Sequence, residues 1–335
     1  AMKTYLANRD VDKIKAMYDI YGLTDEKLDR NLNEWAVDID LVAGGPPCQG
    51  YSGIGHRRTF DVERKDIPSN QLYHQMKRVI EKVRPKIFLF ENVKGLLSGR
   101  WTKSGEKGEI WNDVSTTMKS IDGYVARHTL VQAKHYGVPQ NRPRVLLVGI
   151  RDDIASCPSS DCPDDAIEAG ILPDKNGQMA PHLDELLGDL VDEDYEPGQK
   201  CNDKYLNSPQ SKVQKQLRSK NGKLIFRKGS KLTQQEYSSH KPQIVEKFQW
   251  MIDHQEWRKD DLPEKWRTKK FAQRLLQARW KDEPNITATS LADDYVHYSQ
   301  PRVLTVREWA RLQMFPDWYE FRGPRTTGGR RRAGD

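Results

Sequence analysis

Residues 39–52 read Ile-Asp-Leu-Val-Ala-Gly-Gly-Pro-Pro-Cys-Gln-Gly-Tyr-Ser. The apolar run 39–43 predicts a buried strand, and the glycines and prolines that follow predict a stiffened loop at its carboxyl end. Open α/β sheets bind their ligands at that end of their strands. The loop therefore presents Cys48 as a candidate nucleophile, because a cysteine that only fills a core does not need such a setting.

Three more strand-like runs lie further along the chain, at 86–90, 124–132 and 144–150. Between the first two strands, apolar residues recur at helical spacing over 71–83, just before Pro85. Strands that alternate with helices in this way predict a doubly wound α/β sheet.

The second half of the chain is less regular. We expect a short helix over 183–190, within an acidic region that carries several prolines. A helix over 305–314 is predicted by Thr305, a capping residue with Glu308 three positions later. Between them, residues from about 200 to 283 are polar and basic and predict a smaller separate lobe.

Composition excludes some classes of protein. The chain has 335 residues, of which 36% are hydrophobic, enough to support a core. No stretch approaches the roughly 18 consecutive apolar residues of a membrane span, and the first residues lack the apolar centre of a signal peptide. We therefore expect a cytoplasmic protein with no membrane contact. The four cysteines lack the paired spacing of zinc sites, so no metal is expected.

Charge is distributed unevenly along the chain. Residues 151–200 hold 3 basic and 14 acidic residues, whereas residues 201–283 hold 20 basic and 10 acidic residues. The basic segment also contains four of the nine tryptophans. Basic and flat side chains together suit a surface that meets nucleic acid, although an ordinary solvated face over a tryptophan core fits this composition as well.

Three short motifs stand at predicted strand ends, and their residues could meet in one crevice. They are Pro-Pro-Cys-Gln-Gly at 46–50, Glu91 and Asn92 after the strand 86–90, and Gln140, Arg142 and Arg144 at the start of the strand 144–150. This set suits attack on an electron-poor ring such as cytosine. The thiolate adds, the acid protonates a ring nitrogen, and a guanidinium holds a carbonyl oxygen.

With these motifs the sequence resembles the cytosine-C5 DNA methyltransferases that use S-adenosylmethionine. The similarity rests on segments that stand in that family's order: GGPPCQGYS at 44–52, FLFENVKGLL at 88–97, QNRPRVLLVGIR at 140–151, PNITATS at 284–290 and PRVLTVREWARLQMFPDWYEF at 301–321. The resemblance implies a Rossmann-like, doubly wound sheet of the class I methyltransferase type with a second, smaller DNA-recognition domain.

The resemblance also implies roles for individual residues. Cys48 is expected to attack C6 of a flipped-out cytosine, and Arg144, supported by Arg142, to hold the O2 side. Glu91 is expected to contact N3 and the exocyclic amine, which needs a desolvated carboxyl with a raised pKa. The other residues expected to bind substrate are Gln140, Asn92, which braces the loop, and Ser52.

For the cofactor, Pro46 and Leu72 match family positions that line the S-adenosylmethionine pocket, and Asp19 could approach the adenine. Two alternatives stay open, because Leu72 also fits a core position and Asp19 also fits a turn. The family's Gly-rich N-terminal loop and its C-terminal Gly-Asn-Ala-Val segment find no match. We therefore expect weak or absent cofactor binding by this chain alone, and a complementing chain with the missing motif could restore it.

The predicted domains are a catalytic domain over 1–194, a target-recognition domain over 195–283, and a return to the catalytic domain over 284–335. Within the basic domain, the segment 236–270 is the candidate for contact with the DNA groove. The predicted function is methylation of cytosine in double-stranded DNA as the modification arm of a restriction–modification system. The alternatives are a catalytically inert DNA-binding remnant, one subunit of a split methyltransferase, and a tRNA methyltransferase.

Overall fold

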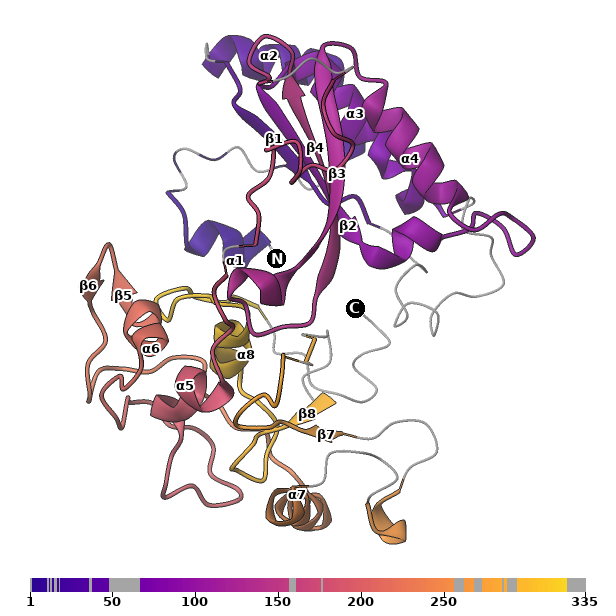
Figure 1. Cartoon of the computed structure of the whole chain (residues 1–335). Coiled ribbons are helices and arrows are strands. Elements are labelled where there is room, and N and C mark those ends of the chain that lie inside the picture. Colours follow the sequence, from indigo (N-terminus) through magenta and orange to yellow (C-terminus); the bar gives the residue numbers. More distant parts are fainter. Residues whose placement is uncertain are drawn as a thin grey trace. The chain divides into compact units, whose positions relative to one another are not determined.

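The computed structural model describes residues 2–10, 12, 14, 17, 19–35, 38–47, 67–156, 161–175, 177–255, 262–267, 273–284, 286–287 and 294–323. The chain divides into two compact units (Figure 1). The sheet unit comprises residues 15–133 and 143–176, and the C-terminal unit comprises residues 1–14, 134–142 and 177–335. Each unit is described by itself.

A four-stranded sheet forms the centre of the sheet unit (Figure 1). Its strands, in spatial order, are β1 (Leu41–Gly44), β2 (Ile87–Val93), β4 (Pro143–Arg151) and β3 (Tyr124–Gln132). The first pair, β1 and β2, is parallel, and the other two pairs are antiparallel. The four predicted strands are all present, and the α/β class with a central sheet is confirmed.

Strand β2 is longer than the sequence predicted. We expected Glu91 and Asn92 to follow the strand, but β2 continues to Val93. The reason is pairing: β4 offers partners beyond Phe90, with Glu91 opposite Leu146 and Val93 opposite Arg144. This antiparallel neighbour comes from far along the chain, so the local pattern could not reveal it.

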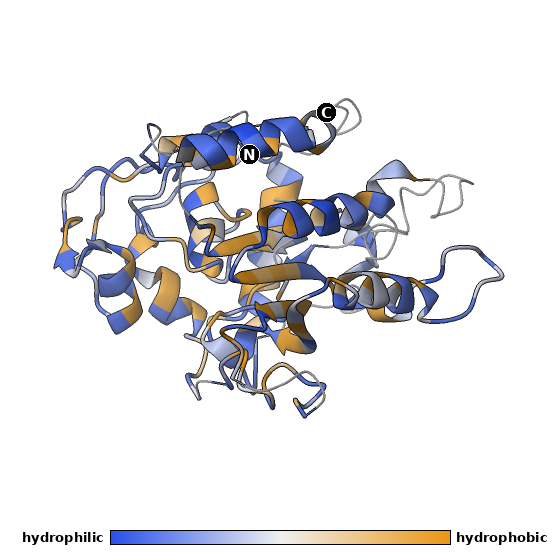
Figure 2. Ribbon diagram, turned by 90° about the horizontal axis from the view of Figure 1, so that it is seen from above, coloured by the Kyte–Doolittle hydropathy of each residue, from blue (hydrophilic) through white to orange (hydrophobic). Residues whose placement is uncertain are grey.

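The helices of the sheet unit are α2 (Asp25–Trp35), α3 (Leu72–Val83) and α4 (Glu109–Lys119), with 3-10 turns η2 (Ile20–Gly22), η5 (Pro68–Gln71) and η6 (Lys94–Ser98). Helices α3 and α4 pack their apolar sides on one face of the sheet. Ile80 and Met118 meet Phe88, Phe90 and Leu147 there, all almost fully buried. The strands show orange hydrophobic residues, while the helices carry blue residues as well (Figure 2).

The opposite face of β3 carries an irregular segment, 161–172. Arg127 on β3 is buried beneath it and donates to the carbonyl oxygens of Pro163 at 2.7 Å and Cys162 at 3.0 Å. The backbone N–H of Ala166 donates to the carbonyl of His128 at 3.1 Å. Buried backbone groups that lack strand partners are therefore satisfied by an arginine and by the strand edge.

The C-terminal unit is built from short elements. Its helices are α1 (Met2–Ala7), α5 (Leu183–Leu187), α6 (Lys212–Leu217), α7 (Pro242–His254) and α8 (Val306–Leu312), with 3-10 turns η8 (Gly188–Leu190) and η10 (Glu264–Trp266). The turn η7 (Ala133–Tyr136) begins where the chain leaves the sheet unit. The strands of the C-terminal unit are β5 (Ser219–Lys220), β6 (Lys223–Leu224), β7 (Arg274–Leu275) and β8 (Tyr295–Val296). Strand β5 pairs with β6, and β7 pairs with β8.

The predicted cap of α8 is confirmed. The Thr305 hydroxyl accepts a hydrogen bond from the backbone N–H of Glu308 at 3.1 Å, and the Glu308 carboxylate accepts one from the N–H of Thr305 at 2.8 Å. This is the reciprocal capping box that the sequence indicated. The helix predicted over 183–190 is also present, as α5 continued by the 3-10 turn η8.

Charged side chains occupy much of the interior of the C-terminal unit. Arg302, Arg307, Arg311 and Glu308 are fully buried, and Asp189 is 1% exposed. Arg302 pairs with Glu308 at 2.7 Å, and Arg311 pairs with Asp189 and Asp317. Buried charges are tolerated only when they are paired, so this network depends on every partner.

The two units do not coincide with the predicted domains, since residues 177–194 and 284–323 belong to the same compact unit as 195–283. The predicted domains were defined by function, as catalytic or target-recognition regions, so their boundaries stay a prediction. Among the helices that the structure describes, none combines the length and the apolar character needed to cross a membrane.

Candidate active site

An ion pair between Glu91 and Arg144 marks the chemically most distinctive point of the sheet unit. The Nε of Arg144 lies 2.6 Å from Oε1 of Glu91. The register explains the pairing, because Glu91 stands opposite Leu146 and Arg144 opposite Val93, which makes the two residues diagonal neighbours on one face. Long side chains reach across such a diagonal in antiparallel sheets.

The Arg144 guanidinium is fixed in orientation. Its Nη1 donates to the carbonyl oxygen of Pro143 at 2.8 Å, while its Nε is engaged by Glu91. Its side chain is 19% exposed and that of Glu91 is 44% exposed. The expected desolvated setting of Glu91 is therefore not found; instead, the carboxylate faces an arginine and partly faces solvent.

Asn92 ties this pair to the loop that follows β1. Asn92 is buried, and its Nδ2 donates to the carbonyl oxygen of Pro46 at 3.1 Å. Its Oδ1 accepts a hydrogen bond from the backbone N–H of Val93 at 2.8 Å. The side chain thus braces the start of the Pro-Pro-Cys loop against β2, which is the role predicted for Asn92 from the sequence.

Gly45 allows the loop to pass close to the carboxylate. A Cβ atom at this position would stand 3.0 Å from Oε2 of Glu91 and 3.6 Å from its carbonyl oxygen. Because β1 and β2 are parallel and Gly44 lies opposite Phe90, their carboxyl ends open at the same edge of the sheet. Gly45 was not among the predicted site residues, although two glycines before the prolines are a signal of close backbone approach.

The predicted cofactor residues lie in different settings. Pro46 is half-buried, and Leu72 is a partly exposed residue at the first position of α3. Leu72 is not among the buried core residues, whereas its neighbour Tyr73 is. Burial, together with the Asp113 carboxylate, raises the pKa of Tyr73 to about 12, so the phenol stays neutral in the core. Leu72 therefore remains available to a ligand.

Leu72 and Pro46 lie near the same edge of the sheet. A Cβ on Gly44 would stand 2.9 Å from Sδ of Met76, so α3 packs directly on the end of β1. Leu72 is one helical turn before Met76 and shares its side of the helix. Asp19 has a local role instead, because its side chain caps η2 and accepts from the N–H of Tyr21 at 3.0 Å. The turn interpretation of Asp19 fits this geometry.

Gln140 and Arg142 belong to the C-terminal unit. The Gln140 side chain is 2% exposed, and its Nε2 donates to the carbonyl oxygen of Leu312 at 2.7 Å. Its amide nitrogen therefore holds the end of α8. Arg142 is half-buried. Cys48 and Ser52, the remaining predicted site residues, lie outside the described residues.

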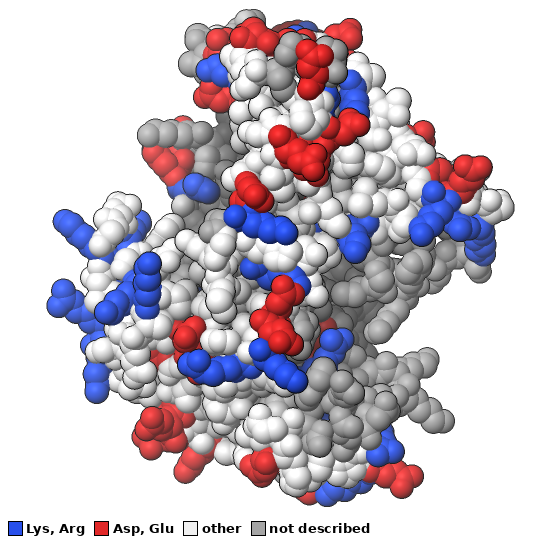
Figure 3. Space-filling model, viewed as in Figure 1, with Lys and Arg blue, Asp and Glu red and all other residues white. Residues whose placement is uncertain are grey.

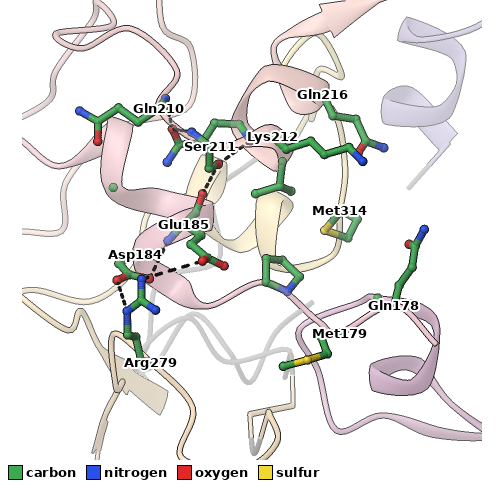
Figure 4. A pocket seen from close by; sticks show the side chains of 15 residues that line it. Gln178, Met179, Asp184, Glu185, Gln210, Ser211, Lys212, Gln216, Arg279 and Met314 are labelled. Atoms are coloured by element: carbon green, nitrogen blue, oxygen red, sulfur yellow. Dashed lines mark hydrogen bonds and ion pairs between the residues drawn. The ribbon is translucent and has the colours of Figure 1, made fainter.

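A polar cavity of about 920 Å³ lies within the C-terminal unit (Figure 4). On one side of it, Arg279 pairs with Asp184 at 2.8 Å, and Ser211 donates to the carbonyl oxygen of Glu185 at 2.6 Å. Its lining includes none of the predicted site residues. Within the described ranges, no group of three or more histidine, cysteine or acidic side chains is arranged to hold a metal ion.

Comparison with known proteins places this geometry in a family. The family model for C-5 cytosine-specific DNA methylases matches residues 1–335. The chain belongs to this family. The resemblance seen in the sequence motifs is therefore confirmed, and the membership extends over the basic segment, which the motifs did not cover.

Two relatives that are named type II methyltransferases agree with this assignment. The type II methyltransferase M.Bpa9945I of Bacillus paralicheniformis is 30% identical over 319 residues, which is 87% of this chain and 66% of that protein. The type II methyltransferase M.DdeI of Desulfomicrobium norvegicum is 30% identical over 307 residues with the same two coverages. The chain thus spans about two thirds of the length of these relatives.

A solved structure supports the fold. A DNA modification methyltransferase encoded within an E. coli prophage superimposes with a TM-score of 0.60 at 21% identity, covering 96% of this chain and 81% of that chain. At this identity the likeness concerns the fold alone. It agrees with a methylase fold built around the central sheet.

Proposed function

We propose that this chain methylates C5 of cytosine in double-stranded DNA with S-adenosylmethionine, as the modification enzyme of a type II restriction–modification system. The observation that carries the proposal is the Glu91–Arg144 pair at 2.6 Å, with Asn92 fastening the carbonyl of Pro46 beside it. A carboxyl, a guanidinium and the cysteine loop then serve one crevice. Membership of the DNA methylase family and the names of the relatives support the substrate.

In the proposed mechanism, Cys48 adds as a thiolate to C6 of the cytosine. The C–S bond breaks the aromaticity of the ring, and the electron pair moves toward N3, where Glu91 delivers a proton. The bound base displaces water from Glu91 and so supplies the desolvation that a proton-carrying carboxyl needs. Arg144 holds the O2 side, with its plane already set by Glu91 and Pro143. Once C5 carries the methyl group, loss of the C5 proton to water and return of the N3 proton to Glu91 would restore the C5–C6 double bond and expel the Cys48 thiolate.

The target base must leave the duplex before C6 becomes accessible. Flipping costs a few kcal/mol, which contacts in the pocket have to offset. S-adenosylmethionine supplies the methyl group when it is bound. Pro46 and Leu72 are the residues proposed to line its site, because both are partly exposed near the edge where β1 ends.

A covalent trap tests the mechanism. Duplex DNA that carries 5-fluorocytosine, incubated with the protein and S-adenosylmethionine, should yield an adduct that survives denaturation. Cys48→Ala should abolish it, and Cys201→Ala, which removes an exposed free cysteine, should leave it unchanged. An adduct that persists in Cys48→Ala would refute the assignment of the nucleophile.

The alternative functions are separated by labelled substrate. Tritiated S-adenosylmethionine should label duplex DNA and not tRNA, in line with the DNA methylases among the relatives, which do not favour the tRNA alternative. Label on neither nucleic acid would point to the inert remnant or to a split enzyme that needs a complementing chain.

A further inference from the structure

The basic segment of the C-terminal unit contains a stretch without any acidic residue. Residues 204–235, between Asp203 and Glu236, contain nine lysines and arginines and no aspartate or glutamate. Arg218 is fully buried, and the other eight side chains are exposed. We call these eight the basic hairpin surface: Lys204, Lys212, Lys215, Lys220, Lys223, Arg227, Lys228 and Lys231.

A tight hairpin forms the centre of this surface. Strands β5 and β6 are joined by Asn221 and Gly222, which have φ values of 52° and 75°. Two residues with positive φ form the turn that suits a two-residue hairpin. The hairpin presents Lys220 directly opposite Lys223. A second pair of like charges, Lys204 and Lys231, stands opposite at an isolated bridge.

Like charges directly opposite each other destabilise a β pair. Several surface cations elsewhere in the chain form ion pairs, as Lys82 does with Asp29 at 2.8 Å, Lys86 with Asp40 at 2.7 Å and Lys265 with Glu246 at 2.8 Å. Within the described part of the chain, no carboxylate forms an ion pair with any member of the basic hairpin surface. Lys220 has its Nζ 5.0 Å from the ring centroid of Trp318, but no carboxylate among the described residues offsets the repulsion. An anionic partner would therefore relieve it.

The base of the hairpin is rigidly held. The buried Arg218 pairs with Asp189 and stacks its guanidinium 3.9 Å from the ring centroid of Tyr205. Its carbonyl oxygen accepts from the N–H of Ile225 at 3.0 Å. On the other side, Nε1 of Trp318 donates to the carbonyl oxygen of Ser219 at 3.2 Å. A charged tip on a fixed base costs little ordering entropy when it binds.

The arrangement of the charges favours a polyanion with a groove. Blue side chains gather over β5, β6 and α6 in Figure 3. Duplex DNA carries closely spaced phosphates, and its major groove admits a two-stranded β-ribbon. The segment 236–270, the earlier candidate, is less suited in its described residues, because Lys247 is buried and Lys265 is already paired.

We propose that the basic hairpin surface docks the phosphate backbone of duplex DNA, with the β5–β6 hairpin directed at the groove. The inference rests on the proposed function and deepens it, because it names the element that holds the substrate. Recognition would then be centred on residues 204–231 and not on 236–270.

Fluorescence anisotropy with a labelled duplex, without cofactor, tests this proposal. The variant Lys220→Gln/Lys223→Gln should bind roughly tenfold or more weakly at about 50–100 mM salt. The slope of log affinity against log salt should become shallower by about 2, because each lost phosphate contact removes about 0.9. The matched control is Lys241→Gln/Lys265→Gln, which removes two exposed lysines from the segment 236–270 and should bind as the unaltered chain does. Thermal melting checks that both variants fold.

Four outcomes overturn the docking surface: no DNA binding by the unaltered chain, an unchanged hairpin variant, a control that loses as much affinity, or tRNA that displaces the duplex as a tighter ligand. Methyl transfer is measured separately. A chain that binds DNA through the hairpin but transfers no methyl group refutes the proposed function and leaves the docking surface intact. If the unaltered chain methylates DNA but the hairpin variant keeps the same salt slope, the proposed function stands and the docking surface is refuted.

Discussion

At the scale of single residues, the orientation of Arg144 matters more than its charge. Its Nε is held by Glu91 and its Nη1 by the carbonyl of Pro143, so the plane of the guanidinium is set before substrate arrives. A lysine would keep the positive charge but not the planar fork. Preorganised donors of this kind contribute to the rate of the chemical step.

We expect Arg144→Lys to lower kcat about 10²-fold and to leave KM for DNA nearly unchanged. Steady-state kinetics with duplex DNA measure both values. Arg151→Lys is the matched control, because Arg151 ends the same strand and forms an equivalent pair with Asp153 at 2.7 Å. An Arg144→Lys enzyme with the original kcat would show that only the charge is needed.

Single residues also differ in whether their place in the site could be predicted from the sequence. The loop with Cys48 and the strand end with Glu91 could be predicted, because local apolar runs and turn residues mark them. The diagonal pairing of Glu91 and Arg144 depends on the register between β2 and β4, which lie about 50 residues apart and pair only in the folded sheet. Asp19 caps a local turn by a geometry that its sequence context left open.

At the scale of elements, helix α8 buries the charged side chains of Arg307, Glu308 and Arg311. The Arg302 guanidinium holds the pKa of the buried Glu308 at about 2, against the effect of burial, which alone would raise it. Nε2 of His297 lies 3.8 Å from Oε1 of Glu308. Burial lowers the pKa of this imidazole to about 3, so it stays neutral. The helix is therefore fastened by a carboxylate that must remain ionised.

The pH dependence of stability follows from this carboxylate. Because the folded pKa of about 2 lies below the ordinary value of 4.5, its contribution is full above about pH 4.5 and is lost as pH falls toward 2. Glu308→Gln should lower the free energy of unfolding at neutral pH by about 3 kcal/mol, because Arg302 loses its partner. The difference between the original chain and this variant should shrink between about pH 4.5 and 2.

Denaturant unfolding at a series of pH values gives that difference. A gap of constant size down to pH 2 would contradict the assigned role of Glu308.

The elements also differ in how readily they could be predicted. The cap of α8 was visible from Thr305 and Glu308, because a capping box is a local pattern. The hairpin over 219–224 was missed although Asn221-Gly222 is a strong turn signal, since strands of two residues leave no alternation to detect. The burial of Arg218, Arg307 and Arg311 could not be foreseen, because each is met by an acid or carbonyl group from far along the chain.

At the scale of the whole molecule, the two compact units have separate cores. The sheet unit is centred on residues such as Ile80 and Phe88, and the C-terminal unit on two clusters that include Leu186 and Phe248. Each unit also has a position where a single substitution should lower the stability of that unit. In the sheet unit this position is Gly149, where an added Cβ would stand 2.0 Å from Cε1 of the fully buried Phe88.

We therefore expect two calorimetric transitions for the whole chain. Gly149→Ala should lower only the transition of the sheet unit, because overpacking costs about 1–3 kcal/mol there, and Glu308→Gln should lower only the other. Adding Phe88→Leu to Gly149→Ala should restore part of the loss by making room for the methyl group. One transition moved by both single variants would show that the chain unfolds as one cooperative unit.

If the basic hairpin surface binds DNA as proposed, its lysines also affect how a target site is found. Charges that bind phosphate do so on any sequence, so a protein held by them can remain on DNA while it moves by sliding and short hops. Association would then be faster than three-dimensional diffusion to one site allows, and the length of DNA scanned in each encounter would shrink as salt rises. Ionic strength would thus set the length of DNA over which a chain that binds in this way can search.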